Sequence, residues 1–209
     1  MTGKIKLVHS GGNSVSIAVP TSNPSSSEVE FKLPGSDGSA NQVLKTDGSG
    51  NLSFGADQVG KILQVVNVLK TDTFTTTSQT YVDLMTATIT PSVNSNKILI
   101  RYGVNGGTGG DVNHPYITIF RDSTDIGQAD AAGNRSRASS VINTQDQSTH
   151  FYGNEVLDSP SSTSAIVYRI KVRTSNTQTA FFNRSARDTD LVAYDGRSTS
   201  FVTVMEVAG

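Results

Sequence analysis

The balance of aliphatic side chains is the feature that most restricts the fold of this chain. Val and Ile together number 33, whereas Leu and Met together number 13. Branching at Cβ limits the rotamers available in a helix and packs well on a pleated sheet, so this bias favours strands. The chain also has 27 Ser, 24 Thr and 19 Gly in 209 residues, which supply the polar turns between strands. We therefore predict an all-β fold.

Two regions differ in the spacing of their apolar residues. In residues 1–58, short apolar runs alternate with turn clusters such as Asp37-Gly38 and Asp47-Gly48, where Gly accepts a positive φ. These runs are too short and too polar to bury a core, so we expect an extended β-meander that needs partners to cover its apolar groups. Residues 59–209 carry longer strand patterns, and we expect them to form an antiparallel, jelly-roll-like β-sandwich head domain.

The clearest strands of the head show strict alternation. Residues 166–173 alternate apolar side chains with three cations, and residues 97–104 repeat the alternation, so one face of each is expected to be buried. Residues 116–120 and 201–207 are apolar on both faces, which is typical of central or doubly covered strands. The four glycines of residues 106–110 predict a flexible hairpin tip.

Residues 59–69 allow two interpretations. Val59, Ile62, Val66 and Leu69 are spaced as the seam of a short coiled coil that joins identical chains. Residues 62–68 also form a continuous apolar run rich in β-branched side chains, which suits a buried strand. Two heptads without caps make a marginal helix, so the strand is favoured.

Charge and hydropathy exclude several classes of protein. The formal net charge is −1 and no basic stripe is present, so we expect no nucleic-acid partner. No apolar run reaches the about 18 residues of a membrane-spanning helix, and residues 1–14 lack the apolar core of a signal peptide. We therefore expect neither membrane insertion nor secretion by that route. Without Cys, the chain has no disulfide, thiolate metal site or cysteine nucleophile.

The polar residues do not form a recognised catalytic or metal-binding motif. His9, His114 and His150 lie far apart and outside any HExxH pattern. Glu occurs only four times, and the 14 Asp lie in turn-rich surroundings, where carboxylates bond to the local backbone. We therefore predict no enzymatic activity, no catalytic residues, no metal site and no cofactor. A polysaccharide depolymerase with an Asp-based site is the catalytic alternative.

Two segments combine aromatic rings with amide groups, which stack on sugars and hydrogen-bond to them. These segments are residues 113–116 and 150–154, and two arginines between them can clamp an anion. The predicted receptor-contact residues are Asn113, His114, Tyr116, Arg135, Arg137, His150, Tyr152 and Asn154. The chain has no Trp, the largest stacking surface, so single contacts with a sugar are expected to be weak.

Several stretches of the sequence resemble one known family. They include the linker LPGSDGSANQVLKTDGSGNLSF, the segment GKILQVVNVLKTDTFTTTSQTYVDL and the C-terminal STSFVTVMEVAG. Together they are similar to tail-fibre, or fibre-like, virion structural proteins of tailed phages that infect marine bacteria and cyanobacteria. The resemblance covers nearly the whole chain and is carried by the order of the stretches rather than by any one of them.

The resemblance implies a virion component that is made in the host cytoplasm. It implies a short homotrimeric fibre, attached to another virion protein through residues 1–58 and oligomerised in part through them, with a head that contacts the host surface. The aromatic and amide residues named above predict that the ligand there is a host-surface glycan. The attachment point can be the tail, baseplate, neck or capsid surface. Two alternatives are a purely architectural decoration or bracing protein of capsid, neck or baseplate, and a soluble carbohydrate-binding module.

Overall fold

The all-β prediction is confirmed. The computed structural model describes residues 4–18, 20–22, 24, 28–40, 42–56, 61–109, 114–143, 148–191, 193 and 195–209. These residues form strands and turns, and none of them belongs to a helix that could cross a membrane. The chain divides into two compact units, Met1–Asp57 and Gln58–Gly209. The boundary predicted after residue 58 lies one residue from this division.

The N-terminal unit contains two separate hairpins rather than one continuous meander. Their turns contain Gly12 and Gly48, whose φ angles of 88° and 82° are accessible mainly to glycine. Each hairpin is an isolated two-stranded antiparallel sheet. The strands are β1 (Lys4–Val8), β2 (Ser14–Ala18), β3 (Gln42–Thr46) and β4 (Leu52–Ala56).

No described side chain of residues 4–56 is buried. The first hairpin shows this most clearly, because Ile5 pairs with Ile17 and Leu7 with Val15 on one face while all four side chains remain exposed. An isolated two-stranded hairpin is marginally stable in water. The described residues of this unit thus form no core, as predicted, and the apolar side chains of the first hairpin are exposed in the single chain.

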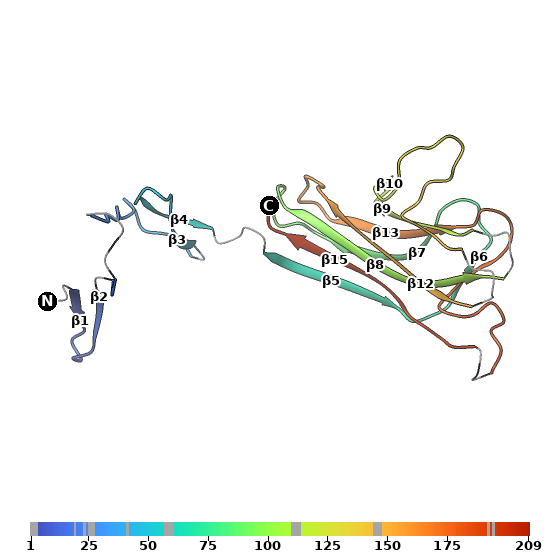
Figure 1. The fold of residues 1–209 in the computed structure, drawn as a ribbon, viewed down its shortest axis with the longest axis horizontal. Coiled ribbons are helices and arrows are strands. Elements are labelled where there is room, and N and C mark those ends of the chain that lie inside the picture. Colours follow the sequence, from blue (N-terminus) through green and yellow to red (C-terminus); the bar gives the residue numbers. More distant parts are fainter. Residues whose placement is uncertain are drawn as a thin grey trace. The chain divides into compact units, whose positions relative to one another are not determined.

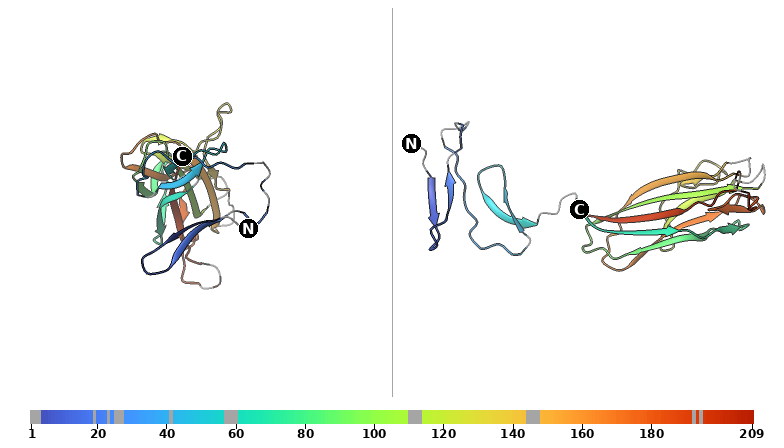
Figure 2. Two further views of the ribbon diagram at one scale, coloured as in Figure 1. Left: turned by 90° about the vertical axis from the view of Figure 1, so that its left-hand side faces the viewer. Right: turned by 90° about the horizontal axis from the view of Figure 1, so that it is seen from below.

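The C-terminal unit is a sandwich of two antiparallel sheets whose strands run along its long dimension (Figures 1 and 2). One sheet has six strands, β5 (Ile62–Lys70), β6 (Phe74–Thr76), β8 (Lys97–Thr108), β12 (His150–Asp158), β14 (Ala180–Phe182) and β15 (Ser200–Val207). The other has five, β7 (Val82–Ile89), β9 (Tyr116–Arg121), β10 (Thr124–Asp125), β11 (Ser140–Val141) and β13 (Ile166–Arg173). The predicted antiparallel β-sandwich is therefore confirmed.

Strand order places β8 and β15 in the middle of the six-stranded sheet. β15 pairs with β5 on one side and with β8 on the other, and β8 pairs along its far side with β12. The central position predicted for residues 201–207 is confirmed. Residues 62–70 form strand β5, so the strand interpretation is correct there, while Val59 lies outside the described residues. The expected burial is wrong, because β5 lies at the edge of its sheet and none of its side chains is buried.

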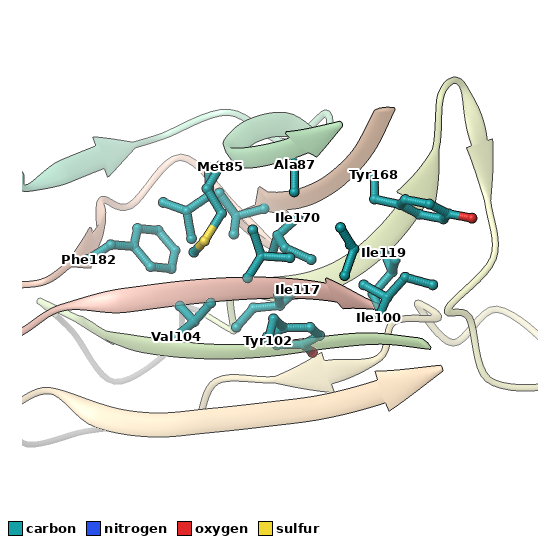
Figure 3. Packing of buried hydrophobic residues seen from close by; sticks show 14 of the residues in the cluster. Met85, Ala87, Ile100, Tyr102, Val104, Ile117, Ile119, Tyr168, Ile170 and Phe182 are labelled. Carbon is teal, nitrogen blue, oxygen red and sulfur yellow. The ribbon is translucent and has the colours of Figure 1, made fainter. Parts of the chain in front are cut away.

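The core lies between the two sheets and follows the predicted alternation (Figure 3). Alternate side chains of β8 and β13 are buried, and Phe182 of β14 closes the core near one end. Burial of each large aliphatic or aromatic side chain contributes roughly 1.5–3 kcal/mol. The buried residues of the two predicted strands are Ile98, Ile100, Tyr102, Val104, Ile166, Tyr168, Ile170 and Val172.

The glycine-rich segment was predicted to be a hairpin tip, and this is wrong for its first half. Gly106, Gly107 and Thr108 continue strand β8 and are buried. A Cβ atom on Gly106 would lie 2.8 Å from Cδ1 of Phe182, so glycine allows this ring to approach the strand. Composition alone does not separate this packing role from a turn. Gly110 lies outside the described residues.

A buried carboxylate fixes the end of the last strand. The side chain of Glu206 accepts hydrogen bonds from Gln64 Nε2 (2.6 Å), Asn96 Nδ2 (2.6 Å), Ser92 N (2.6 Å) and Ser92 Oγ (2.7 Å). Glu206 is 1% exposed. Burial alone would raise the pKa of Glu206, but the hydrogen bonds from Asn96, Gln64 and Ser92 outweigh it and lower this pKa to about 2. Glu206 is thus an ionised group that joins β15 to β5 and to the loop before β8.

Candidate functional site

Three of the predicted receptor-contact residues lie at the end of the sandwich where β8 ends and β9 and β12 begin. Tyr116 opens β9, where the guanidinium of Arg173 lies 4.2 Å from its ring centre. The backbone N–H of His114 donates to Oγ of Ser175 at 2.9 Å. His150 opens β12. Asn113 lies outside the described residues.

The two predicted arginines lie in the exposed loop between β10 and β11. Arg137 Nε donates to the carbonyl of Ala129 at 2.8 Å, and its own carbonyl accepts a hydrogen bond from the hydroxyl of Tyr81 at 3.1 Å. The backbone N–H of Arg135 donates to the carbonyl of Ala132 at 3.3 Å. Arg137 therefore holds the loop in shape, while the side chain of Arg135 is exposed.

The remaining predicted residues lie on the inner side of strand β12. Tyr152 packs against the core, and Asn154 Nδ2 donates to the carbonyl of Ser139 at 2.8 Å, next to β11 of the other sheet. The alternate side chains, Phe151 and Glu155, point to the outer face and are exposed. The structure thus spreads the predicted residues over three places and does not gather the described ones into one pocket.

The outer face of the six-stranded sheet is a surface that the sequence analysis missed. Cross-strand register arranges its side chains in layers that run across four strands. One apolar layer contains Val65, Met205, Leu99 and Leu157. The next layer is polar and contains Asn67, Thr203, Arg101 and Glu155. A second apolar layer contains Leu69 and Phe201, with Phe151 beside them.

Glycine shapes the second apolar layer. A Cβ atom on Gly103 would lie 2.4 Å from Cε1 of Phe201 and 2.5 Å from Cε2 of Phe151, so the two rings converge over Gly103 from the neighbouring strands. Phe151 remains 62% exposed. A shallow groove of about 480 Å³ runs beside this ring. Its lining residues are Arg101, Tyr102, Phe151, Gly153, Asn154 and Glu155.

The outer face of the five-stranded sheet has a different character, because its charges are paired within the chain. Asp83 accepts from Arg169 at 2.5 Å and from Lys171 at 2.8 Å. Burial raises the pKa of Asp83, but these hydrogen bonds outweigh it and hold the pKa below its ordinary value. The guanidinium of Arg173 lies over the rings of Tyr81 and Tyr116. The charged side chains named here therefore each have a partner within the chain.

Only one strand of this surface had a signal in the sequence. Residues 201–207 are apolar at both alternating sets of positions, and Phe201, Met205 and Val207 form the outward set. This pattern predicted a central or doubly covered strand, but it did not identify the neighbouring strands that extend its outward side into a face. Within the described part of the chain, no group of three His, Asp or Glu side chains is placed to hold a metal ion.

Comparisons with known proteins give only distant likenesses. No protein-family model and no curated protein sequence matches the chain. The structure of infectious bursal disease virus Gx strain is 11% identical, with a TM-score of 0.40, and the match covers 75% of this chain and 43% of that chain. The structure of the Gt strain is 12% identical, with a TM-score of 0.40, and the match covers 94% of this chain and 48% of that chain. The present chain spans less than half the length of each of these two viral chains. At this TM-score the likeness assigns no function to the present chain.

Proposed function

We propose that this chain is a structural protein of a phage virion, a short homotrimeric fibre. In this proposal, residues 1–58 attach it to another virion protein and the head, residues 59–209, contacts the host surface through glycan. The segments quoted above, which resemble fibre proteins of marine tailed phages, support the proposal. It assigns the chain no catalytic activity.

One structural observation carries the proposal. Residues 4–56 bury no described side chain, whereas the head has a complete core between two sheets. A segment that cannot bury its own apolar groups gains stability only by contact with a partner or with other copies of itself. A stable head next to a segment that needs a partner suits a protein that is anchored at one end and projects at the other.

The test uses virions that lack this protein. Purified full-length chain should bind to such particles and co-sediment with them, and a labelled sample should bind to host cells. The variant Ile5→Ser/Ile17→Ser removes the apolar pair from the first hairpin and should abolish sedimentation with the particles while cell binding remains. Ser14→Ala/Ser16→Ala, on the other face of the same hairpin, is the matched control. Failure of the unmodified chain to bind particles would refute the anchoring role.

A bracing role is the second candidate, and one observation favours it. The described receptor-contact residues do not converge, and Tyr116, Arg137 and Asn154 are engaged within the chain. A bracing protein binds particles but not cells. If full-length chain sediments with particles and leaves host cells unlabelled, the bracing role replaces host contact.

A further inference from the structure

We infer that copies of this chain pack on one another through the outer face of the six-stranded sheet. The inference deepens the proposed function and rests on it, because it names the surface that joins the copies of the oligomer. The face is formed by β5, β15, β8 and β12 and is called the layered face below. Its edge residues Val65, Leu69 and Leu157 are each more than half exposed in the single chain.

The order of the layers makes this face complementary to itself. Two apolar layers flank one polar layer, and each layer crosses the strands at a constant height along them. A rotation about an axis parallel to the strands preserves that height. Apolar layers therefore meet apolar layers in any closed ring of copies with such an axis, and the polar layer meets the polar layer.

The polar layer fits a second copy better than it fits a partner of one charge. It contains one base, Arg101, and one acid, Glu155. Its other two members are neutral, and Asn67 Nδ2 donates a hydrogen bond to Oγ1 of Thr203 at 2.7 Å. Turning a copy about the same axis brings the β12 half of one face against the β5 half of the next. Glu155 then meets the Asn67 amide, and no like charges are opposed.

The size of the face is sufficient for an interface. Four strands at about 4.8 Å spacing and eight residues at about 3.4 Å each give a footprint of roughly 500 Å² per copy. Two such faces together bury about 1,000 Å², which is the minimum for a biological interface. On the opposite side of the sandwich, by contrast, Asp83 is paired with Arg169 and Lys171 of β13.

The experiment places charges on the two edges of the layered face in the full-length chain. Val65 and Leu157 lie in the same apolar layer but three strands apart, so their side chains are about 14 Å from each other within one copy. Packing of copies brings Val65 of one against Leu157 of the next. Val65→Glu/Leu157→Glu therefore opposes like charges between copies, and Val65→Lys/Leu157→Glu opposes unlike charges.

The readout is molecular mass by sedimentation equilibrium and native mass spectrometry, with circular dichroism as the check of folding. Wild type should assemble at micromolar concentration. The double-Glu variant should dissociate toward the 22.1 kDa chain, with affinity at least about 100-fold weaker. The Lys/Glu variant should stay assembled. Thr86→Glu/Thr88→Glu, on the exposed side of β7 in the other sheet, is the control and should also stay assembled.

Four results would overturn the inference. These are a monomeric wild type at 100 μM, a double-Glu variant as tightly assembled as wild type, a Lys/Glu variant that dissociates as far as the double-Glu variant, and dissociation of the control. A monomeric wild type would also remove the homotrimer from the proposed function, whereas the other three results leave the proposed function standing, because binding to particles is measured independently. A chain that assembles through this face but binds no virion keeps the interface and loses the virion role.

Discussion

Asn96 and Glu206 are 110 residues apart in the chain and are joined by a buried hydrogen bond of 2.6 Å from Nδ2 to Oε1. The backbone N–H of Gly209 donates to the other side of the same amide, at Oδ1 of Asn96, across 3.2 Å. The backbone N–H of Ala208 donates to the carbonyl of Lys61. The first and last residues of the sandwich are therefore fixed to each other and to the loop before β8.

Glu206→Gln should weaken the head. The amide keeps the shape of the carboxylate but turns one acceptor oxygen into a donor, which leaves one or more of the surrounding donors without a partner. A lost hydrogen bond to a charged group lowers stability by about 1.5–3 kcal/mol. Urea unfolding followed by circular dichroism measures the change. Asp130→Asn, at an exposed position, is the control and should stay within about 0.5 kcal/mol of wild type.

Acid should destabilise the head partly through Glu206. The folded-state pKa of about 2 lies below the ordinary 4.5, so the unfolded chain binds the proton first as pH falls. The stability that Glu206 contributes is complete above pH about 4.5 and is lost as pH falls toward about 2. The unfolding free energy of Glu206→Gln should therefore fall less steeply over this window.

Asp195 titrates in the same pH window, so part of the slope should remain in Glu206→Gln. Hydrogen bonds from Ser185 and Thr189 lower the pKa of Asp195 to about 2. The measurement is urea unfolding at a series of pH values from 7 to 2.5. A Glu206→Gln protein with the wild-type slope would contradict the role of this carboxylate, and Asp130→Asn should keep that slope.

The sandwich was predictable from local pattern, whereas the layered face was not. Alternation along residues 97–104 and 166–173 defines the buried sides directly, because the period of a strand is two. The identity of the neighbours depends on register between distant strands, such as Met205 opposite both Leu99 and Val65. No local pattern contains that information.

The predicted contact residues show the same limit. The composition of residues 150–154 identified aromatic and amide groups suited to sugar contact, but not that these residues belong to strand β12 or which side of it faces solvent. The register that sets His150 opposite Gly106 turns Tyr152 toward the core and Phe151 outward. The carboxylate of Glu206 was also missed, because its donors Gln64, Ser92 and Asn96 come from segments far away in the sequence.

Gly106→Ala should destabilise the head although it adds a single methyl group. The new Cβ would lie 2.8 Å from Cδ1 of Phe182 and 3.1 Å from Cδ1 of Ile142, both of which are fully buried. Overpacking of this kind costs about 1–3 kcal/mol. Gly196→Ala is the matched control, since nothing lies within 4 Å of its Cβ position. Thermal unfolding compares the two, and equal melting temperatures would show that Phe182 moves freely.

Tyr116 should act mainly through its ring. The guanidinium of Arg173 lies 4.2 Å from the ring centre, and the side chain is half-buried, so the ring contributes both packing and a cation–π contact. Tyr116→Phe keeps the ring and should leave stability within about 0.5 kcal/mol of wild type. Tyr116→Ala removes the ring and should lower stability by about 2–4 kcal/mol, as truncation of a packed aromatic does.

A double-mutant cycle separates this structural role from receptor contact at Tyr116. Tyr116→Ala and Arg173→Ala should be coupled by about 0.5–1 kcal/mol, because each removes the same cation–π contact. Labelled full-length Tyr116→Phe should bind host cells as wild type does if the ring face, rather than the hydroxyl, contacts the glycan. A Phe variant of full stability that no longer binds cells would show that the hydroxyl of Tyr116 contacts the receptor. Additive effects in the cycle would show that Arg173 does not stabilise the fold through the ring of Tyr116.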